Sequence, residues 1–579
     1  MSLRKLGPIL SQHVEHYFLI SLFFNVSLFV VNFVYSLIFQ NRLLGLILGI
    51  IFLVTVFLNL GAVILSDTYI KRYKKGRLGK WTDVLSYVYL IYLLLNTTFF
   101  IMLQFEIISW ILNQIFFHIL IGFSILYIYL NYTLRKKEEG AEILFKSKGI
   151  KALKITLSLF CGLVFFLMFF LLWGMLTGGP PLVGIGTGSI MNWTSGFFLF
   201  IIPTITILFL KLFTKRNHPK LRAGFLLLGI IFTSILTLPF TSVPFMTLDA
   251  DQQFEKYFGE DWNNFDAEVE EKFTQFHWFL GEYYFGIPKI ESNNFEVERD
   301  LLYSKTDEYE LRYDAYIPKK DDLLGEDATI IYIHGGGWTE GDKNAHPELL
   351  RYLACQGYYI YDIQYRLADF SFASELAGID TEISIGAPAD EDLVGDWTID
   401  DLISDIANFT RFLHLNNEFG ANLKNVYFMG GSAGGYLAGM ASFCFNEGYW
   451  NFSPWLNITG SILFFPPNDA EHFFYDLGIF YEKGFIPGDK TPKEDPDLYK
   501  KLTPSESVDK DDPPCLIFHG TSDSLVPYEN SETIHKEMVD HEVPCILVKG
   551  YFGAHGHTEA AQHLSIARYY MERFLYLTK

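Results

Sequence analysis

The chain has 579 residues, of which half are hydrophobic, and its formal net charge is −21. The charge is divided unevenly, because residues 1–245 contain 21 Lys and Arg against 7 Asp and Glu, whereas residues 246–579 contain 24 against 59. An acidic second part argues against a nucleic-acid partner, which favours basic patches. Composition therefore predicts a hydrophobic domain followed by a separate acidic domain large enough to bury its own core.

Seven apolar stretches in residues 1–245 are long enough to cross a bilayer, which takes about 20 residues each. They lie near residues 17–39, 43–65, 83–104, 108–130, 153–175, 195–213 and 223–243. None carries Asp, Glu, Lys or Arg well within the span, which argues against an ion-coupled transporter. The polar residues inside the spans are interpreted as interhelical hydrogen-bonding groups: Asn25, Asn59, Asn96, Gln114 and His118.

Basic residues fall in alternate loops of this domain. They gather at Arg4 and Lys5 and in residues 71–80, 135–151 and 215–222, whereas the other loops hold Arg42, Glu106 and an uncharged stretch around Gly178. Basic loops face the cytoplasm. The sequence therefore predicts a multi-pass protein of the cell membrane, with a cytoplasmic N-terminus. An odd span count then places residues 246–579 outside, and one span more or fewer would reverse this.

Residues 246–295 are acidic and aromatic and are predicted to be a helical connector. Beyond them, strands are expected at 296–303, 309–317, 328–334, 358–364, 424–430, 460–465, 515–519 and 544–550. Helices are expected at 346–356, 396–416, 433–446, 527–540 and 558–576. This alternation predicts a mainly parallel, doubly wound α/β sheet over residues 296–579, with ligands bound beyond the carboxyl ends of its strands. Two inserted segments, 368–396 and 466–512, are interpreted either as lid segments or as surface loops.

The run Val426–Tyr436 reads as an apolar strand, a Gly-x-Ser-x-Gly pentad and a helix of small residues. That order is typical of a nucleophile elbow, in which Ser432 occupies a strained turn at the helix N-terminus. A second strand ends in His334-Gly335-Gly336-Gly337-Trp338. Gly336 and Gly337 are candidates to donate backbone hydrogen bonds to an oxyanion, together with the N–H of Ala433.

An acid and a base follow at two later strand ends. Asp523 lies in a turn after strand 515–519, and His555 lies in the turn after strand 544–550. The sequence predicts that His555 takes the Ser432 proton while Asp523 orients the imidazole. His557 is the rival base at this stage. His334 and His519 are interpreted as structural residues.

Together these segments resemble the α/β-hydrolase superfamily, in its carboxylesterase branch with hormone-sensitive-lipase-like and feruloyl-esterase-like enzymes. The likeness covers about residues 300–579 and also includes Gly341-Asp342-Lys343, Tyr365-Arg366-Leu367-Ala368 and Val526-Pro527. It implies Ser432 as nucleophile, Asp523 as acid and His555 as base. Members of this branch often carry Phe where this chain has His557.

The predicted function is a membrane-anchored serine hydrolase that cleaves a carboxylic ester through an acyl-enzyme outside the cytoplasm. The same triad would serve an acyltransferase or deacylase acting on a lipid- or carbohydrate-linked acceptor, and a third alternative is an inactive receptor or scaffold. Expected partners are a small-molecule, lipid or carbohydrate ester and membrane lipids. No cofactor or metal is expected, since the five cysteines lack metal-ligand spacing. The oligomeric state is left open.

Overall fold

The computed structural model describes residues 3–37, 42–73, 77–104, 110–134, 148–179, 181–213, 218–274, 277, 294–319, 323–369, 391–476, 485–559 and 561–579. The chain forms two compact units. The helical unit comprises Met1–Trp173, Trp193–Thr241 and Phe279–Pro288, and the sheet unit comprises Gly174–Asn192, Ser242–Trp278 and Lys289–Lys579. The predicted domain boundaries after residues 245 and 295 stay a prediction.

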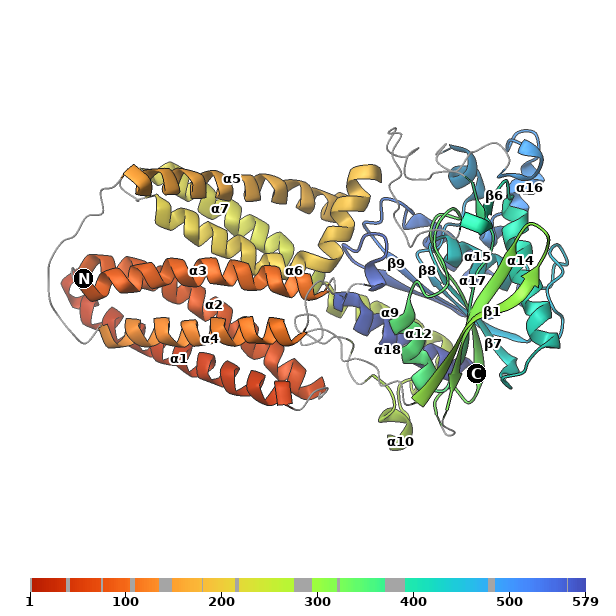
Figure 1. The fold of residues 1–579 in the computed structure, drawn as a ribbon, viewed down its shortest axis with the longest axis horizontal. Helices are drawn as coiled ribbons and strands as arrows, with labels where there is room; N and C mark the ends of the chain where they lie inside the picture. The colour runs from red at the N-terminus through yellow and green to blue at the C-terminus, as the bar shows by residue number, and fades with distance from the viewer. Residues whose placement is uncertain are drawn as a thin grey trace. The chain divides into compact units, whose positions relative to one another are not determined.

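Long apolar helices build the helical unit (Figure 1). They are α1 (Leu3–Leu37), α2 (Arg42–Tyr73), α3 (Arg77–Gln104), α4 (Trp110–Leu134), α5 (Lys148–Thr177), α6 (Pro181–Leu212) and α7 (Pro219–Leu236), followed by the four-residue α8 (Leu238–Thr241). The end of α5 and the first turns of α6 belong to the sheet unit. Seven stretches of the described residues are long and apolar enough to cross a membrane: His16–Tyr35, Ile47–Ser66, Val84–Met102, Leu112–Thr133, Ile155–Thr177, Thr194–Leu212 and Pro219–Phe258. The prediction of seven apolar helices is confirmed.

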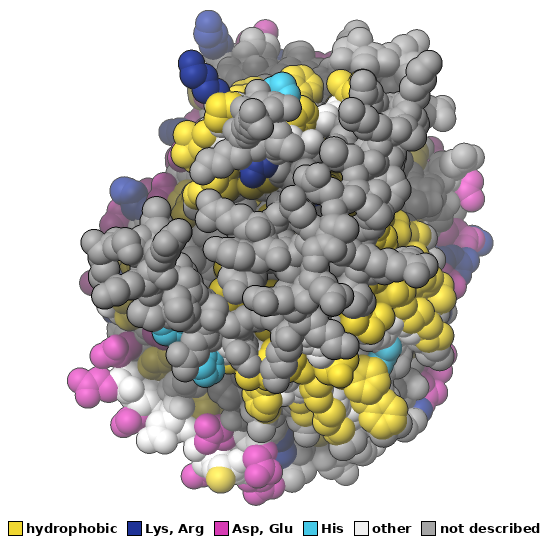
Figure 2. All heavy atoms as spheres, turned by 90° about the vertical axis from the view of Figure 1, so that its left-hand side faces the viewer, with side chains coloured by type: hydrophobic (Ala, Val, Ile, Leu, Met, Phe, Trp, Pro, Cys, Tyr) yellow, Lys and Arg dark blue, Asp and Glu magenta, His cyan; other side chains and the backbone are white. Residues whose placement is uncertain are grey.

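Four of the five predicted polar side chains within these helices form interhelical hydrogen bonds, whereas the amide of Asn96 has no partner among the described residues. Asn25 and Asn59 exchange two amide hydrogen bonds of 2.8 and 3.0 Å between α1 and α2, and Asn32 donates to Gln114 of α4. Large apolar side chains point outward instead, and Leu159 is 69% exposed. Hydrophobic side chains form broad exposed stretches in Figure 2. Apolar surface of this extent is stable in lipid, which supports a multi-pass membrane domain.

The sheet unit contains eight strands in the order β1-β2-β4-β3-β7-β8-β9-β10. Their bounds are β1 (Phe295–Lys305), β2 (Glu310–Pro318), β3 (Ala328–Ile333), β4 (Tyr359–Ile363), β7 (Asn422–Gly431), β8 (Ile458–Phe464), β9 (Cys515–Gly520) and β10 (Cys545–Gly550). Only β2 runs against its neighbours. The predicted mainly parallel α/β sheet is confirmed. A small second sheet pairs β5 (Leu367–Ala368) with β6 (Val394–Gly395).

Helices cover both faces of the large sheet because alternate strand residues are apolar on both sides. On one face Ile331 and Ile333 pack with α14 (Ile399–Leu415), α15 (Ala433–Phe443) and α17 (Glu529–Asp540). On the other face Ile330 and Tyr332 pack with α9 (Val243–Phe258), α12 (Pro347–Cys355) and α18 (Ala561–Thr578). The remaining elements are short: α10 (Ala267–Glu270), α16 (Pro496–Lys501), a π-helical turn (His472–Asp476) and 3₁₀ turns at Glu391–Leu393, Pro487–Asp489, Pro504–Ser507 and His557–Glu559.

The predicted helices are present with shifted ends. The helix expected over 396–416 begins at Ile399, where Thr398 and Asp401 form a capping box, and the one expected over 433–446 ends at Phe443. The two insertions are described only in part, since residues 370–390 and 477–484 lie outside the described residues. Their interpretation as lid or loop therefore stays open.

Candidate active site

Ser432 lies at a sharp turn between β7 and α15. Its φ of 55° and ψ of −123° are rare for a residue with a side chain, and the surrounding bonds hold it there. The Ser432 N–H donates to Phe464 O, and Tyr436 N–H donates to Ser432 O. Gly434 is required at this turn, because a Cβ there would lie 2.1 Å from Ile333 O. The structure thus has the strand, strained serine and helix that the pentad predicts.

Three predicted side chains meet at the ends of β7, β9 and β10. His555 Nε2 lies 3.0 Å from Ser432 Oγ, and His555 Nδ1 lies 2.7 Å from Asp523 Oδ2. The Asp523 side chain is fully buried, and its Oδ1 accepts hydrogen bonds from Leu525 and Val526 N–H. This order lets the imidazole donate to the carboxylate while its other nitrogen accepts the serine proton.

Asp523 is held in its charged form. Burial alone raises the pKa of this carboxyl, but the charge of His555 and hydrogen bonds from His519 and His555 outweigh it and lower the pKa below its usual range. His519 Nε2 lies 3.3 Å from Asp523 Oδ2 and 2.9 Å from Val526 O, while its Nδ1 lies 2.6 Å from Ser531 Oγ. His519 therefore links the turn that carries Asp523 to Ser531 of α17.

The rival histidine lies elsewhere. His557 is fully buried, and neither ring nitrogen has a hydrogen-bond partner among the described residues. Burial holds the pKa of His557 well below its ordinary value. Its ring packs instead near His563, at 5.2 Å between ring centroids. Of the two, only His555 lies within hydrogen-bonding distance of Ser432.

The glycine turn after β3 lies against the nucleophile. A Cβ on Gly335 would come within 3.4 Å of Ser432 Cβ. Gly336 and Gly337 have φ of 124° and 61°, so both use backbone conformations that favour glycine. Ala433 is the first residue of α15, where backbone N–H groups lack intrahelical acceptors. Gly335 thus lies against Ser432, Gly336 and Gly337 follow it in the chain, and Ala433 follows Ser432, while the role of these three as oxyanion donors stays a prediction.

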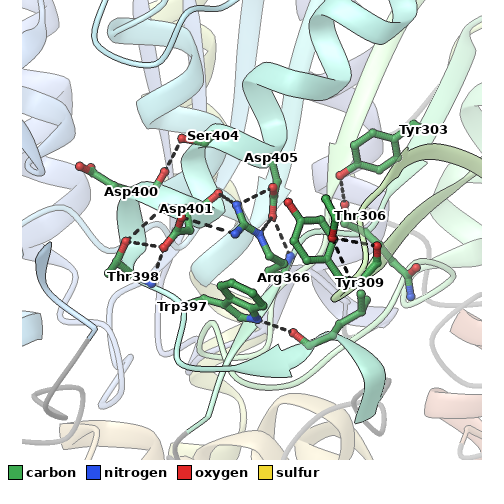
Figure 3. Close-up of polar contacts among 12 residues, drawn as sticks. Tyr303, Thr306, Tyr309, Arg366, Trp397, Thr398, Asp400, Asp401, Ser404 and Asp405 are labelled. Atoms are coloured by element: carbon green, nitrogen blue, oxygen red, sulfur yellow. Dashed lines mark hydrogen bonds and ion pairs between the residues drawn. The ribbon is translucent and has the colours of Figure 1, made fainter.

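Arg366 is a buried arginine at the centre of a cluster of polar contacts (Figure 3). Arg366 donates from Nε and Nη2 to both carboxylate oxygens of Asp405, and its guanidinium lies between the rings of Tyr309 and Trp397. The chain on either side of Arg366 bonds to the glycine turn. Tyr365 Oη donates to His334 O, and Ala368 N–H donates to Trp338 O.

Arg366 belongs to a sequence motif for which no role is predicted, and Asp405 is not among the predicted site residues. Asp405 is a single acid within an apolar face of α14, beside Leu402, Ile406 and Phe409, all of them buried. An acid on such a face requires a partner. A single acid on an otherwise apolar helix face is thus the sequence signal by which Asp405 could have been found.

Aromatic rings surround the catalytic side chains. The Phe465 ring lies 4.5 Å from that of His555, measured between centroids. Trp338, Tyr436, Phe474 and Phe485 form a buried cluster beside the glycine turn, with Trp338–Phe474 centroids 5.3 Å apart. His334 stacks on Tyr365, and burial lowers the pKa of His334 to about 4. As predicted, His334 bonds within its own loop, to Gly335 O.

Comparison with known proteins agrees with this geometry. Residues 313–382 and 391–538 match the family model BD-FAE. An acetyl esterase of Salmonella dublin is 23% identical over 234 residues, which are 38% of this chain and 61% of that protein. A probable isoprenylcysteine alpha-carbonyl methylesterase of Arabidopsis thaliana is 25% identical over 267 residues, or 44% of this chain and 56% of the relative. The chain thus spans about 60% of the length of these curated relatives.

Among solved structures, esterase B from Lactobacillus rhamnosis aligns with 49% of this chain and 87% of its own, at 24% identity and a TM-score of 0.37. The sheet unit is thus similar to esterase-like α/β-hydrolase domains, as the resemblance implied. Within the described residues, no group of three or more His, Cys, Asp or Glu is arranged to hold a metal ion.

Proposed function

We propose that this protein is a membrane-anchored serine hydrolase of carboxylic esters. The observation that carries the proposal is the alignment of Ser432, His555 and Asp523 at 3.0 and 2.7 Å. The match to an esterase-like family model and to an acetyl esterase supports the same reaction. The name of that relative makes acetyl esters the first substrates to test.

In the proposed reaction Ser432 Oγ attacks the ester carbonyl carbon while His555 Nε2 takes its proton. Negative charge develops on the carbonyl oxygen, where the N–H groups of Gly336, Gly337 and Ala433 donate to it. The C–O bond to the alcohol then breaks, and His555 returns the proton to the leaving oxygen. Water then attacks the acyl carbon while His555 takes one of its protons. The bond between the acyl carbon and Ser432 Oγ breaks, His555 returns the proton to Ser432 Oγ, and the carboxylic acid leaves.

The proposed location is the cell membrane, with the sheet unit on the extracytoplasmic side. Seven apolar helices and the basic alternate loops support this orientation. Protease treatment of intact cells tests it, because an external sheet unit is cleaved without lysis. A sheet unit that is cut only after lysis would show that the orientation is wrong.

The decisive test of activity uses the full chain in detergent, since residues Gly174–Asn192 belong to the sheet unit. Wild type should hydrolyse p-nitrophenyl acetate and react covalently with a fluorophosphonate probe. Ser432→Ala should lose labelling, and kcat should fall by about 10⁴-fold or more. Equal labelling of wild type and Ser432→Ala, or none of either, would exclude the proposed function.

A further inference from the structure

A segment between two candidate membrane spans is part of the sheet unit. Gly174–Asn192 groups with the catalytic residues, although it lies more than 200 positions before Ser432 in the chain. It contains the end of α5 and the first turns of α6, and it joins the spans Ile155–Thr177 and Thr194–Leu212. The contacts of this segment with the turns that carry Asp523 and His555 are therefore relevant to the geometry of the active site.

The segment touches the turns that carry both the acid and the base. Gly178, with φ of 73°, lies so close to the acid turn that a Cβ would be 3.2 Å from Ser522 O. Gly188 lies closer still to the base turn, because a Cβ there would be 2.5 Å from Ala554 Cβ. Ser522 and Ala554 immediately precede the catalytic Asp523 and His555.

Asn192 makes the polar contacts. Its side chain is buried, with 2% of the residue exposed. Asn192 Oδ1 accepts from Ala554 N–H at 3.0 Å, and Asn192 Nδ2–H donates to His555 O at 3.1 Å. One amide thus satisfies a donor and an acceptor on the two residues that define the backbone position of the catalytic imidazole.

Among the described residues, one other hydrogen bond links the backbone of Gly553–His555 to the turn that carries Asp523. Ser522 N–H donates to Gly553 O at 2.9 Å. The remaining backbone bonds of this turn are local, Gly553 N–H to Gly550 O and His557 N–H to Ala554 O. Asp523 and Ser432 hold the His555 imidazole, whereas the amide of Asn192 makes the non-local hydrogen bonds to the backbone of Ala554 and His555 among the described residues.

We infer that Asn192 is a positioning residue that holds His555 in line with Ser432, so that a helix continuing as a membrane span completes the active site. This inference rests on the proposed hydrolase function. Truncation of Asn192 leaves Ala554 N–H and His555 O without partners and releases the turn. A displacement of about 1 Å at a catalytic group costs on the order of 10²-fold in rate.

The test compares Asn192→Ala, Asn192→Leu and Asn192→Asp in the full chain. Asn25→Ala is the matched control, because it also removes a buried, hydrogen-bonded amide from an apolar helix. For p-nitrophenyl acetate we expect kcat to fall about 10- to 100-fold in the Ala and Leu variants, with KM within about 3-fold of wild type. Asn192→Asp keeps the acceptor for Ala554 and should lie between them and wild type.

Hydrogen exchange provides a readout that does not depend on activity. The peptide containing Ala554 and His555 should exchange faster in Asn192→Ala than in wild type or Asn25→Ala. Unchanged kcat and unchanged exchange would overturn the inference. It is also overturned if kcat falls equally in Asn25→Ala, or in proportion to the folded fraction of each variant.

Failure of the proposed function gives a different pattern. Wild type would then neither hydrolyse the ester nor react with the fluorophosphonate. The positioning role of Asn192 would fail together with the proposed function, even if hydrogen exchange shows that Asn192 contacts the His555 turn. With an active wild type, unchanged kcat in Asn192→Ala overturns the inference whether or not hydrogen exchange changes.

Discussion

His555 Nε2 lies 3.0 Å from Ser432 Oγ, although 123 residues separate the two in the chain. The contact exists because β7 and β10 run parallel in one sheet and both end at the same edge. His557, only two residues further on, is buried away from the nucleophile. This difference between neighbouring histidines gives a direct test of their roles.

Replacing His555 by Ala should lower kcat by about 10⁴-fold, because no other base in the described part of the chain is hydrogen-bonded to Ser432 Oγ. His557→Phe should keep kcat within about 3-fold of wild type, since burial lowers the pKa of His557 and neither ring nitrogen has a hydrogen-bond partner among the described residues. Steady-state kinetics on p-nitrophenyl acetate, with folding checked by thermal unfolding, separate the two. Activity lost in His557→Phe but kept in His555→Ala would reverse the assignment.

Asp523 should make stability depend on pH. Its pKa is lower in the folded chain than in the unfolded one, so its charge stabilises the fold above the unfolded value of about 3.9, and this contribution is lost as pH falls below it. Asn at this position has no such dependence. The difference in melting temperature between wild type and Asp523→Asn should therefore be constant near neutral pH and shrink below about pH 4. A difference that grows on acidification would contradict the lowered pKa.

The glycine turn should affect catalysis rather than substrate binding. A Cβ on Gly336 would lie 2.0 Å from Glu340 O, so Gly336→Ala must move the turn and its N–H groups. We expect kcat to fall about 10²- to 10³-fold, the loss that follows removal of one oxyanion donor. Gly448→Ala is the control. Gly448 also has positive φ but has nothing within 4 Å of an added Cβ, so its variant should lose stability and keep kcat.

The Arg366–Asp405 pair should show strong coupling in a double-mutant cycle. Arg366→Met or Asp405→Leu alone leaves an unpaired buried charge and should cost about 3–5 kcal/mol of unfolding free energy. The double variant removes both charges and should cost much less than the sum of the two. Denaturant unfolding of the full chain measures all four proteins. Additive losses would mean that the pair does not act as a unit.

Much of the sheet unit is predictable because its strands are continuous apolar runs that end in chemically distinct turns. Val426–Tyr436 shows this well, since strand, pentad and small-residue helix adjoin one another. The meeting of Ser432, Asp523 and His555 also followed, because parallel strands share one carboxyl edge. Helix ends were less predictable: capping by Thr398 and Asp401 shortened α14 relative to its apolar pattern.

The role of Asn192 could not be predicted. It looks like any polar residue near the end of a span, and its partners lie 362 and 363 positions away. The sequence around Gly178 predicts only an uncharged loop. Asp405 could not be assigned a partner for a different reason. The acid on the apolar face of α14 is visible in the local sequence, but its partner Arg366 follows another element, the strand β4.

The bond between Asn192 and the His555 turn also has a consequence for biogenesis. The ribosome completes α6 long before it reaches residue 554. The Asn192 amide therefore cannot bond to the His555 turn until every strand of the sheet has been synthesised. Contacts of such high sequence separation form late in folding, because the intervening chain must first be ordered. A nascent chain therefore contains a nucleophile elbow before its general base is secured. On the inference drawn above, the proposed active site is complete only after α6 has been made and the sheet has folded.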